Sequence, residues 1–156
     1  MSDASVMIVG IGNPDRGDDA VGRLVARRLR AMVGPGVAVV EHDGEAASLL
    51  DRLAGARTAF LIDACVSGAP PGTARRIDLG TDAGILPDLQ FGLSTHGFGL
   101  AEAIALGRAL GSLPPRAIVY AIEAGSFETG GGLTRAVADA VGTVAKQVAE
   151  EVMQDA

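Results

Sequence analysis

Acidic side chains and one histidine recur in this sequence close to points where apolar stretches end. The candidates for chemistry are Asp18, Asp19, Asp43, Asp63 and His96. Carboxylates and an imidazole from separate loops can hold a hard or borderline metal ion. The same groups can act as a general acid and a general base. The residue types alone leave both chemistries open.

Asp18 and Asp19 stand at the far end of a glycine-rich turn over residues 10–22, which reads Gly-Ile-Gly-Asn-Pro-Asp-Arg-Gly-Asp-Asp-Ala-Val-Gly. The turn follows an apolar run at 6–9 and leads into a helical pattern. A helix N-terminus attracts anions, but two fixed carboxylates would repel a phosphate. We therefore expect this turn to suit a cation or a polarised carbonyl.

Each candidate also has a purely structural interpretation. Asp18 or Asp19 can cap the first helix, and capping by one would leave the other available for chemistry. Asp63 can simply be solvated, and His96 can hydrogen-bond locally at a helix start. His42, beside the second apolar stretch, is expected to be structural or exposed rather than catalytic.

The one cysteine, Cys65, is expected to pack as a small buried hydrophobe. A nucleophilic pair of Cys65 with His96 is the alternative. A lone cysteine cannot form an internal disulfide, which is consistent with a reducing compartment. The sequence contains neither Gly-x-Ser-x-Gly nor His-Glu-x-x-His, so it signals neither a hydrolase elbow nor a helical zinc site.

The composition predicts one acidic domain over residues 1–156, long enough to bury a core. Apolar residues make up 48% of the chain but aromatic residues only 3%, which favours close helix–sheet packing. A net charge of −6 argues against a nucleic-acid partner. No apolar run approaches the roughly 20 residues that span a bilayer, and no secretory signal is evident. We expect a cytoplasmic protein without a membrane partner.

The hydrophobic pattern predicts strands at 5–10, 37–41, 58–63, 73–79 and 117–122, and helices at 18–32, 45–53, 100–110 and 134–153. Residues 80–93 are expected to be irregular. This order predicts an α/β fold, a three-layer α/β/α sandwich around a twisted, mostly parallel five-stranded sheet. Sites in such sheets form beyond the carboxyl ends of the strands, where the candidate residues fall.

Four sequence blocks together resemble the endopeptidases that mature nickel-iron hydrogenases. They are Gly-Ile-Gly-Asn at 10–13 with Asp-Asp-Ala-Val-Gly at 18–22, Leu-Ile-Asp-Ala at 61–64, Ser-Thr-His-Gly-Phe-Gly-Leu-Ala-Glu at 94–102, and Ala-Ile-Glu at 121–123 with Gly-Leu-Thr at 132–134. Each block is weak alone. Their order and spacing cover essentially the whole chain and make the resemblance fairly specific.

The resemblance implies a phosphorylase/hydrolase-like sandwich with a metal-contacting and catalytic triad of Asp19, Asp63 and His96. Asp18 is then expected to cap the first helix, and Asp18 and Asp43 are further candidates for substrate recognition. The family's Asp-Gly-Gly-Thr is replaced here by Asp-Gly-Glu-Ala at 43–46, which leaves the role of Asp43 open.

The resemblance also implies one cleavage near the C-terminus of a hydrogenase large-subunit precursor, after nickel insertion. The nickel would arrive on the substrate, and no stably bound metal of the chain's own is expected. Three ligands with open positions could grip that nickel, and the metal or a carboxylate could activate a water. Either Asp19 or Asp63 could serve as the base.

Two other enzyme or binding classes share parts of this pattern. Peptidyl-tRNA hydrolases also begin with a strand and Gly-Leu-Gly-Asn-Pro, but they place His-Asn near the position of Asp18 and Asp19 and need a basic surface for tRNA. A dinucleotide-binding module would need different glycine spacing and no acids at the turn. A third alternative keeps the family but not the cleavage, as a non-catalytic hydrogenase assembly factor.

Overall fold

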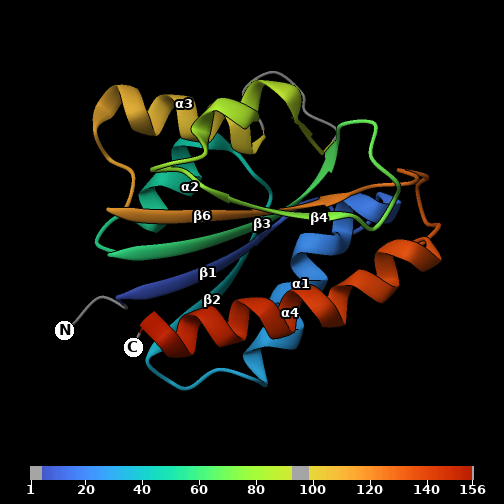
Figure 1. The fold of residues 1–156 in the computed structure, drawn as a ribbon, viewed down its shortest axis with the longest axis horizontal. Coiled ribbons are helices and arrows are strands. Elements are labelled where there is room, and N and C mark those ends of the chain that lie inside the picture. Colours follow the sequence, from blue (N-terminus) through green and yellow to red (C-terminus); the bar gives the residue numbers. More distant parts are fainter. Residues whose placement is uncertain (1–4, 93–98, 156) are drawn as a thin grey trace.

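The computed structural model describes residues 5–92 and 99–155, which form a sheet between two layers of helices (Figure 1). The strand order is β2-β1-β3-β6-β4, and a short β5 pairs with β3. The strands are β1 (Val6–Ile11), β2 (Val37–His42), β3 (Thr58–Val66), β4 (Ala74–Asp78), β5 (Gln90–Phe91) and β6 (Arg116–Glu123). β1, β2, β3 and β6 are mutually parallel, whereas β4 and β5 run antiparallel to their partners.

Helices cover both faces of the sheet (Figure 1). They are η1 (Gly17–Ala20), α1 (Val21–Arg30), α2 (Ala46–Leu53), η2 (Ala83–Asp88), α3 (Leu100–Leu110) and α4 (Arg135–Asp155), where η marks a 3-10 helix. α1 and α4 pack on one face, and α2 and α3 pack on the other. This arrangement confirms the predicted three-layer α/β/α sandwich with its mostly parallel sheet. Within the described ranges, every helix is too short or too polar to cross a membrane.

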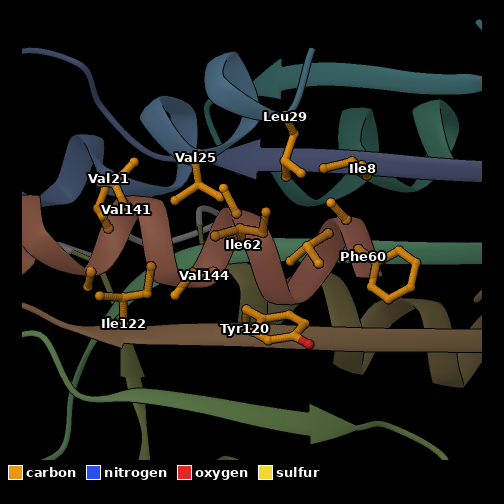
Figure 2. Packing of buried hydrophobic residues seen from close by; sticks show 14 of the residues in the cluster. Ile8, Val21, Val25, Leu29, Phe60, Ile62, Tyr120, Ile122, Val141 and Val144 are labelled. Carbon is orange, nitrogen blue, oxygen red and sulfur yellow. The ribbon is translucent and has the colours of Figure 1, made fainter. Parts of the chain in front are cut away.

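Alternation along the buried strands sorts their side chains between the two helical layers. Figure 2 shows the layer under α1 and α4, where large apolar side chains from strands and helices interdigitate. The labelled members are Ile8, Phe60, Ile62, Tyr120 and Ile122 from the strands, and Val21, Val25, Leu29, Val141 and Val144 from the helices. The alternate strand residues, such as Leu61 and Val119, face α2 and α3 instead. The side chain of Asp63 shares that second face by alternation with Leu61.

Two glycines bring α1 into backbone contact with the sheet. A Cβ on Gly10 would lie 2.2 Å from the carbonyl oxygen of Gly22, and a Cβ on Gly22 would lie 2.2 Å from the carbonyl oxygen of Ile62. Neither position has room for a side chain. The start of α1 is therefore held close to β1 and β3, which places the preceding acidic turn beside Asp63.

Parts of the predicted secondary structure were wrong. β3 continues to Val66, three residues past Asp63, because Cys65 pairs with both Phe91 of β5 and Glu123 of β6. Residues 80–93, expected to be irregular, contain η2 and β5, both too short to give a periodic signal. The first predicted helix is split into a 3-10 turn at η1 and an α-helix that ends at Arg30.

Candidate active site

The turn after β1 wraps around Asp19. The N–H of Gly12 donates to the carbonyl of His42, after which the chain leaves the sheet and returns through η1. A Cβ on Gly12 would lie 1.8 Å from the carbonyl oxygen of Asp19, so only glycine fits there. The N–H of Asn13 donates to Asp19 Oδ2 at 2.9 Å. The turn thus fixes the orientation of the carboxylate of Asp19, a residue that is only 7% exposed.

Asp63 is the second buried carboxylate of this region, and its residue is 3% exposed. Its Oδ1 accepts a hydrogen bond from the N–H of Ala64 at 2.8 Å. Burial raises the pKa of Asp63 well above its ordinary value, and the negative charge of Asp19 raises it further, against a smaller opposite effect of the Ala64 hydrogen bond. The carboxyl group of Asp63 therefore holds a proton more readily than an exposed aspartate does.

Gly92 shows how closely the two carboxylates converge. A Cβ built on Gly92 would lie 2.6 Å from Asp19 Oδ1 and 3.9 Å from Asp63 Oδ1, so one point is near an oxygen of each acid. Gly92 has φ of +57° and donates its N–H to the carbonyl of Ala64 at 2.9 Å. Its bare backbone covers the acid pair. A side chain on this residue would meet the carboxylate of Asp19.

Gly92 escaped the sequence reasoning, although the sequence held a signal for it. The residue lies between Phe91 and Leu93, and an isolated glycine in an apolar stretch often marks a close approach of backbone to another group. His96, the third member of the predicted triad, falls within 93–98 and lies outside the described residues. The structure thus brings together two of the three predicted members.

Asp18 has a different role from the predicted helix cap. Its side chain makes no capping bond to η1 or α1, so that prediction was wrong. The carboxylate instead accepts four hydrogen bonds from the loop between β6 and α4: from the N–H groups of Gly125 (2.7 Å), Ser126 (3.0 Å) and Thr134 (2.7 Å), and from the Thr134 hydroxyl (2.8 Å). The residue is fully buried. This geometry anchors a loop and does not support the predicted substrate contact.

Asp43 and Glu45 lie where the chain departs from the family pattern. Asp43 is exposed, and its Oδ1 accepts the N–H of Glu45 at 3.0 Å. The Glu45 carboxylate accepts the N–H groups of Ala47 and Ser48, which makes Glu45 the N-cap of α2. The departure therefore supplies a helix cap. Substrate recognition by Asp43 stays a prediction.

His42 has the structural surroundings that the sequence suggested. Its Nδ1 accepts the N–H of Gly44 at 2.9 Å, and its Nε2 lies 3.1 Å from the Ser48 hydroxyl oxygen. Burial lowers the pKa of His42, and the neighbouring carboxylate of Asp43 acts in the opposite direction. An Nδ1 that accepts a hydrogen bond belongs to a neutral ring.

Cys65 is buried, as predicted, beside a buried glutamate that sequence reasoning left without a role. Glu123 accepts hydrogen bonds from the N–H and the hydroxyl of Ser67, and the Cys65 thiol lies 3.7 Å from its Oε1. Burial raises the pKa of the Cys65 thiol to about 12, with the Glu123 carboxylate adding to the rise. A thiol of that pKa is a poor nucleophile at neutral pH, which disfavours the Cys65–His96 pair.

Comparison with known proteins identifies the family to which this chain belongs. A family model described as hydrogenase maturation protease matches residues 23–151. The chain belongs to the hydrogenase maturation protease family. The match spans Asp63 and His96 and begins after Asp19.

Relatives of known structure share the family's fold. The hydrogenase maturating endopeptidase HybD from E. coli is similar, with a TM-score of 0.79 and 24% identity, covering 99% of this chain and 94% of that one. The [NiFe] hydrogenase maturation protease HycI from Thermococcus kodakarensis KOD1 gives a TM-score of 0.69 at 24% identity, covering 94% and 91%.

One curated relative is longer than this chain. The hydrogenase expression/formation protein HupD of Thiocapsa roseopersicina is 26% identical over 136 residues, which is 86% of this chain. The match spans 61% of the length of that protein.

Proposed function

We propose that this chain is an endopeptidase that removes the C-terminal extension of a [NiFe] hydrogenase large-subunit precursor after nickel has been inserted. Asp19, Asp63 and His96 contact the nickel that the substrate carries. The observation that carries the proposal is the convergence of Asp19 and Asp63 at Gly92. Membership in the maturation protease family supports it and favours it over a peptidyl-tRNA hydrolase.

The acid pair suits a metal that is delivered rather than stored. Two buried carboxylates repel one another, and the raised pKa of Asp63 records that repulsion together with the cost of burial. A divalent cation between them would relieve it. A metal that already has ligands on the substrate needs fewer from the protease.

The chemistry then follows from the charge of the substrate's metal and from one proton acceptor. The positive charge polarises the scissile carbonyl, and a carboxylate of the pair takes a proton from the attacking water. The water oxygen bonds to the carbonyl carbon, the C–N bond breaks, and the leaving amine takes up a proton. A precursor without nickel lacks the charge that aligns it, so nickel insertion becomes the condition for cleavage.

The test is mass spectrometry of a nickel-loaded large-subunit precursor incubated with the wild-type protein, Asp63→Ala or His96→Ala. We expect wild type alone to release the C-terminal peptide. Asp139→Asn is the matched control, because Asp139 is an exposed aspartate of α4. Intact cleavage by either site variant would refute the triad. Equal cleavage of nickel-free precursor by wild type would refute nickel recognition.

A further inference from the structure

β4 is the last strand of the sheet and pairs with β6 alone (Figure 1). The N–H of Glu123 donates to Thr73 and the N–H of Leu79 donates to Ala117, which fixes the alternation of the ladder. By that alternation, Ala74 and Arg76 direct their N–H and C=O groups away from β6. In the part of the chain that the structure describes, no strand pairs with this outer edge. It offers hydrogen bonds to an added strand.

Arg75 lies in the same cross-strand row as Asp63. Ala121 of β6 is the register partner of Asp63 on one side and of Arg75 on the other. Strands are spaced about 4.8 Å apart, so the Arg75 backbone is about 10 Å from that of Asp63. Residues paired across a sheet direct their side chains to the same face, so Arg75 points to the face that carries Asp63. Arg75 is also the cation that opposes the rise in the pKa of the Cys65 thiol, a rise caused chiefly by burial.

The Arg75 guanidinium takes part in none of the ion pairs found between described residues. Those of the other arginines engage Arg23, Arg27 and Arg30 with Glu41, and Arg76 with Glu151. Arg75 is only partly exposed. A guanidinium in this setting can bind a carboxylate through two parallel hydrogen bonds.

An open groove of about 690 Å³ runs beside the edge of β4, between the strand and η2. Its lining includes Arg75 and Ile77 from the strand and Thr81, Asp82 and Ile85 from the following segment. Arg76 also lines the groove but is paired with Glu151, whereas Arg75 lies at the end nearer Asp63. The acid, Asp82, lies past the far end of β4, where its carboxylate accepts the N–H of Asp78. The groove is therefore electrostatically suited to a peptide whose acidic side chain lies toward the carboxylate pair.

We propose that this groove binds the substrate's extension as a strand added to β4, and that Arg75 pairs with an acidic side chain of that extension. The inference rests on the proposed function and specifies its substrate. A strand beyond β4 lies three strand spacings from β3, about 15 Å, which about five extended residues cover. An acidic residue of the added strand therefore falls at about the fifth position after the scissile bond or later. Main-chain hydrogen bonds to β4 supply affinity, and Arg75 supplies specificity.

Cleavage kinetics on the nickel-loaded precursor test the role of Arg75. We expect Arg75→Ala to raise KM about tenfold with little change in kcat, the loss of about 1.4 kcal/mol of binding. Arg57→Ala is the matched control, because Arg57 is an exposed arginine that precedes β3 at the other end of the sheet. A precursor with lysine in place of the acidic residue should be a poor substrate for wild type and a better one for Arg75→Glu. Equal KM for Arg75→Ala and Arg57→Ala would overturn the proposal.

Peptide binding separates this inference from the proposed function. The probe is a fluorescent synthetic peptide with the sequence of the extension, measured by anisotropy against wild type and Arg75→Ala. Binding by wild type that weakens in Arg75→Ala supports the groove even where no precursor is cut. N-methylation of the peptide backbone should weaken binding whether the peptide carries the acidic residue or lysine, since it removes the N–H donors that pair with β4. Absent binding to wild type, or equal binding to both proteins, would overturn the groove while leaving the carboxylate site intact.

Discussion

Asp18 and Asp63 are buried carboxylates on neighbouring elements with opposite surroundings. Asp18 accepts four hydrogen bonds from Gly125, Ser126 and Thr134, so its charge is well solvated by the protein. Among the described residues, Asp63 accepts a hydrogen bond only from the N–H of Ala64, the next residue in the chain, and it lies beside the like charge of Asp19. A saturated carboxylate stabilises a fold, whereas an under-solvated one beside a second acid is typical of a functional site. The number of hydrogen bonds each carboxylate accepts therefore distinguishes the structural Asp18 from the candidate site residue Asp63, whereas burial does not, because both residues are buried.

The largest expected effect is on cleavage when Asp63 is changed. Asp63→Asn keeps an oxygen for the Ala64 N–H but removes the charge that contacts the metal or takes a proton. We expect the rate to fall about 10²- to 10⁴-fold. The same change should raise the free energy of unfolding of the metal-free protein by about 1 kcal/mol, because it removes a repelled buried charge. The measurements are precursor cleavage and urea unfolding; an active or strongly destabilised variant contradicts the assignment.

Asp18→Ala should have the opposite profile. The substitution leaves three backbone N–H groups and the Thr134 hydroxyl without their acceptor, in a region with little access to water. We expect the free energy of unfolding to fall by about 3 kcal/mol. Urea unfolding measures it, with Asp139→Ala as the exposed control expected to change little. A loss no larger than that of the control would mean that the four hydrogen bonds stabilise nothing.

Gly92→Ala tests the contact between the two acids without removing either. The new Cβ would meet Asp19 Oδ1 at 2.6 Å, and the φ of +57° costs a non-glycine residue about 1–2 kcal/mol. We expect a stability loss of about 1–2 kcal/mol and reduced cleavage. Gly68→Ala is the control, because Gly68 also has positive φ but no atom within 4 Å of its added Cβ. Cleavage lowered equally in both variants would place the effect in the backbone rather than at Asp19.

The sequence predicted most of the scaffold and both acids of the pair. The scaffold and the acids could be predicted because each leaves a signal within a continuous stretch of sequence. The helix at 100–110 and the apolar strands have periodicity, and a carboxylate in an apolar strand stands out. The partners of Asp18 could not be predicted in this way. They come from a loop more than 100 residues away, which only tertiary packing brings to η1. η2 and β5 are too short to give a periodic signal, so the isolated glycine at 92 was not connected with the acid pair.

The pH dependence of stability gives the smallest effect and the most direct view of the carboxylate pair. The folded-state pKa of Asp63 is raised, so above the ordinary aspartate pKa of about 3.9 the folded state binds more protons than the unfolded state. The contribution of Asp63 to stability therefore declines as pH rises through that window, and it levels off once pH passes the raised folded pKa. Urea unfolding of wild type and Asp63→Asn, both in chelator, isolates this contribution. The stability advantage of the variant should grow with pH across the window and then become constant; an advantage that does not change with pH would mean that Asp63 is ionised alongside Asp19 throughout, and that the pair is not strained.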